Sequence, residues 1–108
     1  MITFHEVGDY VILEAVGHYE IKDVIQQLDQ LISKKDDPVT LIIDVRKSKA
    51  TPSYQEVADL GRYLKEIEAK LSGGVYLTSD ELRYGLSNVV VAHADVDGKL
   101  ERVRLTEN

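Results

Sequence analysis

The sequence predicts one α/β sandwich built on a mixed β-sheet, and three observations lead to this fold class. Two short β-prone runs open the chain, strand-like and helix-like segments alternate after them, and the run "VTLIIDV" at residues 39–45 is almost wholly apolar. Such a continuous apolar run is typical of a strand buried on both sides of a parallel sheet. Parallel neighbours need crossover connections, which are right-handed and usually contain a helix. A chain of 108 residues is most simply one domain, residues 1–108.

The two N-terminal runs, residues 2–7 and 10–16, predict an antiparallel hairpin. Gly8-Asp9 separates them, and a glycine at the first central position suits a two-residue hairpin turn. Both alternating sets of side chains in the second run are mostly apolar. We therefore expect both faces of this strand to be covered.

A first amphipathic helix is predicted at about residues 20–35. Its apolar residues recur with the spacing of one helical face, at Ile21, Val24, Ile25, Leu28, Leu31 and Ile32. The segment "KKDDP" ends it, because Pro38 disfavours helical geometry in the residue before it.

A second amphipathic helix is predicted at residues 53–71. Ser53 and Glu56 have the spacing of a capping box, and Pro52 precedes them. The apolar stripe of this helix consists of Val57, Leu60, Leu64, Ile67 and Leu71. We expect the helix to stop at Ser72-Gly73-Gly74, where a glycine can adopt the left-handed C-cap conformation. A short strand at residues 75–79 should follow.

Two structures fit the next segment, residues 80–105. The run Val89-Val90-Val91 and the pair Asp97-Gly98 favour a hairpin of strands 88–96 and 100–105. Alternatively, residues 80–94 form a helix with Ser79 as its N-cap, since apolar residues also recur there on one helical face. The pattern alone favours the hairpin slightly.

Four segments, taken in order, resemble those of one known family. They are "VILEAVGHYEIKDVIQQLDQLI", "VTLIIDVRK", "GGVYLTSDELRYGLSNVV" and the late strand "VRL". Their order is similar to that of the STAS domains, which have the fold of the sporulation anti-sigma-factor antagonist, and in particular to the SpoIIAA-like group of small uncharacterised bacterial proteins. The resemblance implies a two-layer sandwich with a helix at 80–94 and a strand at 100–105. It therefore shifts the preference for that segment to the helix.

The composition argues against several classes of function. Acidic residues outnumber Lys and Arg by 19 to 13, and the net charge of −6 disfavours nucleic-acid binding and adsorption to anionic membranes. The chain has no cysteine, and its three histidines, His5, His18 and His93, lack metal-ligand spacing. With neither a signal peptide nor an apolar span, we expect no membrane insertion, no cofactor, no metal and a cytoplasmic location.

The loop "RKSKATPS", residues 46–53, is the candidate site. It follows the central strand at the carboxyl edge, where α/β sheets usually bind ligands, and it carries Arg46, Lys47 and Lys49. Ser53 is first a helix cap, but an anion or a phosphate on Ser53 would meet free N–H groups at the start of a helix. Phosphorylatable members of the family carry an Asp-Ser-Ser type sequence in this region, whereas this chain has Pro52-Ser53-Tyr54. Asp44 is expected to accept hydrogen bonds from loop amides rather than to act as a general base.

The resemblance implies a non-enzymatic regulatory or protein-interaction module, with Arg46, Lys47, Lys49, Ser53 and Tyr54 at its contact edge. No pair of nucleophile and base can be identified, so we do not expect an enzyme. The alternative is a carrier of a small apolar ligand, because the group is also similar to lipid carriers of the Sec14 type. The family usually ends in a further helix that this sequence lacks. We therefore expect a sheet face that is partly uncovered, which a second copy could cover in a homodimer.

Overall fold

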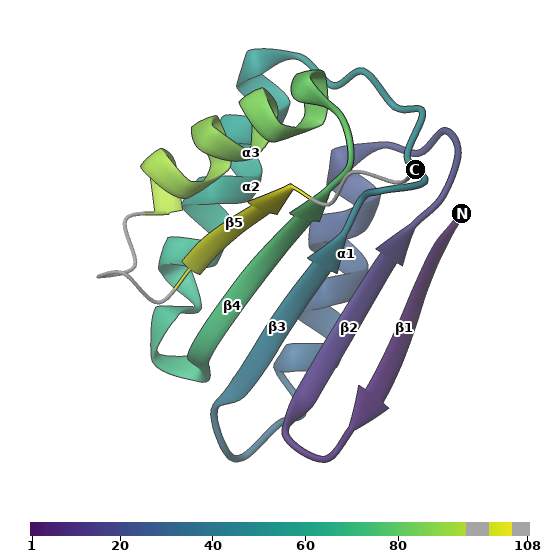
Figure 1. Cartoon of the computed structure of the whole chain (residues 1–108). Helices are drawn as coiled ribbons and strands as arrows, with labels where there is room; N and C mark the ends of the chain where they lie inside the picture. Colours follow the sequence, from purple (N-terminus) through teal and green to yellow (C-terminus); the bar gives the residue numbers. More distant parts are fainter. Residues whose placement is uncertain (95–99, 105–108) are drawn as a thin grey trace.

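The computed structural model describes residues 1–94 and 100–104, and its centre is a five-stranded mixed sheet (Figure 1). The strands follow one another across the sheet in sequence order: β1 (Ile2–Val7), β2 (Tyr10–Ala15), β3 (Val39–Asp44), β4 (Leu71–Thr78) and β5 (Leu100–Arg104). The connections contain α1 (Ile21–Ile32), α2 (Tyr54–Glu66), the single 3-10 turn η1 (Glu68–Lys70) and α3 (Glu81–Ala94). Only β1 pairs antiparallel, and the other pairs are parallel. The predicted fold class is confirmed.

The N-terminal hairpin forms as predicted. Tyr10 pairs with Val7 directly across the turn, and Gly8 has a φ of 59°. A side chain at this position would strain the backbone, which is why the turn carries a glycine.

The core lies between one face of the sheet and the helices. Leu13, Ile43 and Tyr76 are neighbours in the register of β2, β3 and β4, and all three are buried. The helices fill the space above them with the buried side chains of Val24, Leu28, Ile32, Val57, Leu60, Leu64 and Val90. Each such side chain contributes about 1.5–3 kcal/mol when it leaves water, so this face supplies most of the hydrophobic stabilisation.

The opposite face of the sheet is not covered by a helix, and it is turned toward the viewer in Figure 1. Ile12, Ile42 and Val75 lie side by side on it and remain partly exposed, as does Leu77. The expectation that both faces of β2 are covered is therefore wrong, and the expectation of a partly uncovered face is confirmed for the described residues. The reason is topological: when strands follow in sequence order, right-handed crossovers place every connecting helix on one side.

The second helix is shorter than predicted. α2 ends at Glu66, η1 follows, and β4 already begins at Leu71, so Gly73 and Gly74 belong to a strand rather than to a helix C-cap. Leu71 is buried and pairs with Val39. Leu71 would be buried either at the end of a helix or at the start of a strand. Its position in the apolar stripe could therefore not distinguish a helix from a strand. The first helix is also shorter than the predicted range of 20–35, since α1 spans Ile21–Ile32.

The ambiguous segment is helical. α3 spans Glu81–Ala94, so the resemblance gave the correct structure and the alternative strand at 88–96 is wrong. The β-prone valines are held in a helix because Val90 and Ala94 are both fully buried in the packing against α2. The predicted final strand is β5, Leu100–Arg104, while the Asp97-Gly98 turn lies outside the described residues.

Gly61 sets how closely α2 and α3 approach. A Cβ atom at this position would lie 2.5 Å from the carbonyl oxygen of Val90 and 2.6 Å from the Cβ of His93. Both distances are far below van der Waals contact, and the nearer atom belongs to the backbone. The two helices can therefore pack only if residue 61 has no side chain.

We predict that Gly61→Ala lowers the free energy of unfolding by about 1–3 kcal/mol, because the helices must separate. The matched control is Gly85→Ala in α3, where an added Cβ meets nothing within 4 Å. The control should raise stability by up to about 1 kcal/mol, since alanine favours helix over glycine. Urea unfolding followed by circular dichroism measures both. Equal effects of the two substitutions would contradict the close approach.

Candidate functional site

The loop after β3 is held against the neighbouring loop by backbone hydrogen bonds. The N–H of Gly17 donates to the carbonyl of Lys47 at 3.0 Å, and the N–H of Lys49 donates to the carbonyl of Gly17 at 2.8 Å. Gly17 and Ser48 form a parallel bridge, so the pairing of β2 with β3 resumes beyond the ends of both strands. Gly17 has a φ of 70°, a conformation that favours glycine. The loop is thus a fixed part of the carboxyl edge.

Asp44 and Arg46 neutralise each other at the end of β3. The guanidinium of Arg46 donates from Nε to Asp44 Oδ1 at 3.0 Å and from a terminal nitrogen to Oδ2 at 2.8 Å. The backbone N–H of Arg46 also donates to Oδ1, at 3.1 Å. Partial burial opposes the ionisation of Asp44, but the hydrogen bonds and charge of Arg46 outweigh it and hold the pKa of the carboxyl below its usual value. The predicted role of Asp44 as an acceptor for the loop is confirmed.

Lys47 and Lys49 are exposed, as are Ser53 and Tyr54. Arg46 is only half-buried, but its guanidinium is directed to Asp44 rather than to the start of α2. Of the three loop cations, the two lysines therefore remain the candidates for contact with a partner.

Ser53 caps α2 as predicted. Its hydroxyl accepts from the N–H of Glu56 at 3.2 Å, and the carboxylate of Glu56 accepts from the N–H of Ser53 at 3.0 Å. The capping box thus already places one negative charge at the positive end of the helix. A phosphate on Ser53 would meet this like charge, which opposes the binding of an anion there.

Tyr54 connects the start of α2 to α3. Its ring meets the His93 ring edge to face at 5.6 Å, and the tyrosine hydroxyl lies 3.3 Å from His93 Nε2. Tyr54 nevertheless keeps 63% of its surface exposed. A fixed, exposed aromatic ring is the type of side chain that protein interfaces use as an anchor.

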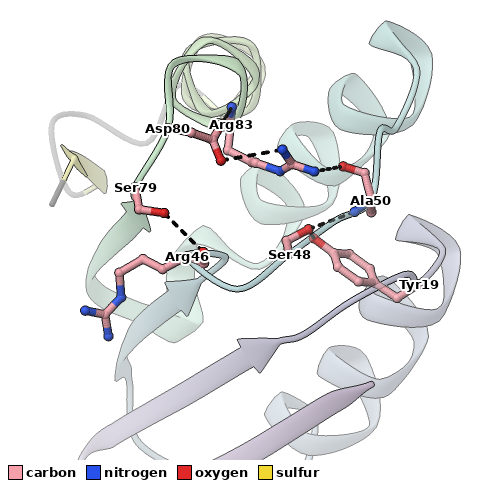
Figure 2. A network of polar contacts seen from close by, with 7 residues as sticks. All are labelled: Tyr19, Arg46, Ser48, Ala50, Ser79, Asp80 and Arg83. Carbon is pink, nitrogen blue, oxygen red and sulfur yellow. Dashed lines mark hydrogen bonds and ion pairs between the residues drawn. The ribbon is translucent and has the colours of Figure 1, made fainter. Parts of the chain in front are cut away.

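A polar cluster lies beneath the loop, and the sequence did not predict that its residues meet (Figure 2). The Ser48 hydroxyl donates to the Tyr19 oxygen at 2.9 Å and accepts from the N–H of Ala50 at 3.2 Å. Arg83 reaches from α3 and donates to the carbonyl of Ala50 at 2.8 Å. Three segments that are distant in sequence therefore meet under the loop.

Arg83 and Asp80 also organise the start of α3. Asp80 accepts from the N–H of Arg83 at 2.8 Å, so Asp80 caps this helix and the expectation that Ser79 does so is wrong. Ser79 instead donates to the carbonyl of Arg46 at 3.1 Å, which attaches β4 to the loop. The sequence contained one indication of this cap: Asp80 stands directly before the helix, and aspartate is among the residues preferred at that position.

The hollows between the sheet and the helices are small. One, lined by Tyr19, Ser48, Ala50 and Arg83 among others, has a volume of about 10 Å³. A second, lined by core side chains such as Leu13, Ile43 and Leu60, also has about 10 Å³. Each has room for about one water molecule. The larger depressions are open, and that between α1 and α2, with about 310 Å³, is bordered by Glu20, Lys22, Glu56 and Asp59.

The described residues contain no group of three or more His, Asp or Glu side chains that could hold a metal ion. Within the same residues, no helix is long and apolar enough to cross a membrane. His5 lies on β1, His18 in the turn after β2, and His93 in α3.

The fold is similar to that of a solved protein. The structure of an uncharacterized protein of the DUF3478 family, with a SpoIIAA-like fold, from Shewanella loihica PV-4 superimposes with a TM-score of 0.59. The alignment covers 95% of this chain and 84% of that chain, at 15% sequence identity. This chain therefore has a SpoIIAA-like fold, as the sequence resemblance implied. No protein-family model matches the chain, and neither does any curated protein.

We predict that Asp44→Asn destabilises the protein in a pH-dependent way. The folded-state pKa of Asp44 is lowered, so its contribution is fully present above the unfolded pKa of about 4 and is lost as the pH falls through the folded value. The free energies of unfolding of wild type and Asp44→Asn should differ by a constant amount between pH 5 and 7. The difference should shrink below about pH 4. Urea titrations at several pH values measure it, and a difference independent of pH down to 2.5 would contradict the ion pair.

Proposed function

We propose that the protein is a non-enzymatic regulatory or interaction module that presents the carboxyl edge of its sheet to a protein partner. One observation carries the proposal: Lys47, Lys49, Ser53 and Tyr54 are all exposed on a single segment whose backbone is fixed by its neighbours. A surface that is ordered before binding loses little conformational entropy when a partner docks. Two lysines beside an exposed tyrosine suit a partner with an acidic surface that also offers an apolar pocket.

The hydrogen bonds that Asp44 accepts from Arg46 support a binding role over catalysis at this edge. A general base needs a carboxylate that can reach a substrate proton. Both oxygens of Asp44 instead accept from Arg46, and the residue is buried. Ser48 is likewise buried, and its hydroxyl is engaged by Tyr19 and Ala50.

The volumes of the hollows favour an interaction module over a carrier of an apolar ligand. A ligand pocket for a small organic molecule typically measures about 300–1,000 Å³ and is largely enclosed. The two hollows between sheet and helices have about 10 Å³ each. Lipid carriage by this fold would require the helices to move away from the sheet.

We predict that reversing the two loop charges weakens the binding of a partner. Lys47→Glu/Lys49→Glu and a matched control, Lys22→Glu/Lys34→Glu, change the net charge equally, and all four lysines are exposed. Each tagged variant is used to capture proteins from the source cell, and a protein held by wild type is then purified. Its affinity, measured by calorimetry, should fall at least tenfold for the loop variant and stay within twofold for the control.

Equal affinities of the two charge variants would contradict a role for the loop. Native mass spectrometry of the protein purified from cells tests the carrier alternative. A mass increased by a bound lipid would favour carriage, and the mass of the bare chain supports the interaction module.

We predict further that the protein is a homodimer whose interface is the open sheet face. Ile42→Lys should give a monomer in light scattering at high micromolar concentration, because it places a charge at the centre of the row formed with Ile12 and Val75. Leu82→Lys is the control, since Leu82 is 52% exposed on α3. A monomeric wild type would contradict this prediction.

A further inference from the structure

Beside the hollow under the loop lies a cationic donor that has no acceptor within the described part of the chain. The Nε–H of Arg83 is buried and has no hydrogen-bond partner among the described residues. One terminal nitrogen of this guanidinium donates to the Ala50 carbonyl at 2.8 Å, and the other lies 3.5 Å from Asp80 Oδ2. Buried donors are almost always satisfied, and a charged one is the most costly to leave unpaired.

Tyr19 brings a second hydroxyl donor to the same hollow. The Ser48 hydroxyl donates to the Tyr19 oxygen, so that hydrogen bond does not use the proton of the tyrosine. Burial raises the pKa of Tyr19, so the hydroxyl keeps this proton at neutral pH. Tyr19 and Arg83 both line the hollow of about 10 Å³.

Among the described residues, the other walls of the hollow carry no charged side chain. Val45, Pro52, Tyr76 and Leu86 surround the polar groups. Asp80 is the carboxylate paired with Arg83, but it is 43% exposed and its shortest contact is with the backbone N–H of Arg83 at 2.8 Å. Two donors, one of them cationic, in a hollow whose described lining has no carboxylate favour an acceptor with negative charge.

The hollow lies at the carboxyl edge of the parallel strands, where α/β folds bind ligands. Its walls come mainly from the loops after β2 and β3 and from α3, and single residues of α1, α2 and β4 complete them. The side chain of Arg83 retains 16% exposure, so part of this side chain is reached from solvent. The volume accepts a single oxygen atom, while the rest of a ligand would remain outside.

We propose that this hollow binds one oxygen of a carboxylate or phosphate group, with Arg83 Nε–H and the Tyr19 hydroxyl as donors. The site is distinct from the start of α2, where Glu56 opposes an anion. The loop carbonyl of Ala50 and the bound oxygen would share the same guanidinium, so the anion and the position of the loop are linked. The inference does not require a protein partner, and it can hold even if no partner is captured.

The test is an NMR titration of the ¹⁵N-labelled protein with sodium acetate and, separately, sodium phosphate, with sodium chloride at matched ionic strength as the reference. We expect a saturable shift of the Arg83 Nε–H signal and of the backbone amides of Ser48 and Ala50. The Nε–H signal of Arg62, which is paired with Asp59 on the surface of α2, serves as the internal control. Saturation with acetate alone identifies a carboxylate site, with phosphate alone a phosphate site, and with both a site for either group.

Two variants make the assignment specific. Tyr19→Phe keeps the ring and removes one donor, so the affinity should fall about 5- to 10-fold. Arg83→Lys should abolish the saturable shifts, and circular dichroism checks that it still folds. Tyr10→Phe, at an exposed position on β2, is the matched control and should bind like wild type. The absence of saturation, shifts shared equally by Arg62, or an unchanged affinity in Tyr19→Phe would each overturn the proposal and leave the hollow as a water site.

Discussion

The continuation of β2–β3 pairing past the strand ends is the constraint on which the rest of the carboxyl edge depends. Two hydrogen bonds at Gly17 fix the backbone of the loop at Lys47 and Lys49. With the backbone fixed there, Ser48 must point inward to Tyr19 while its neighbours point outward, because side chains alternate along an extended segment. The same backbone presents the Ala50 carbonyl to Arg83. One glycine thus determines which groups of the loop face the solvent and which face the interior.

The sequence predicted the elements whose signals are local and repeated. The stripe beginning at Ile21 and the Ser53–Glu56 box depend on spacing along one segment, and both are present in the structure. The spacing of apolar residues could not distinguish helix from strand where both would bury the same side chain. Leu71 is buried at the end of a helix or the start of a strand, and Val90 in a helix or a hairpin.

The candidate site was predicted only for the residues that its own loop carries. Lys47, Lys49 and Ser53 could be proposed because they are contiguous. Tyr19 and Arg83 join the same edge from segments 29 and 35 positions away from Ser48, and no local pattern announces such a meeting. The ion pair between Arg46 and Asp44 was also not predicted, because no sequence pattern indicates that a side chain folds back onto its own strand.

The absence of a side chain at Gly61 affects how motion would pass between the helices. α2 and α3 approach so closely that no layer of rotatable side chains separates their backbones at this point. Packed interiors transmit strain when side chains cannot rearrange to absorb it. A displacement at the first turn of α3 would therefore carry α2 with it as a rigid body. Tyr63 of α2 also donates to Asp29 of α1 at 3.1 Å, so a hydrogen bond links α2 to the remaining helix.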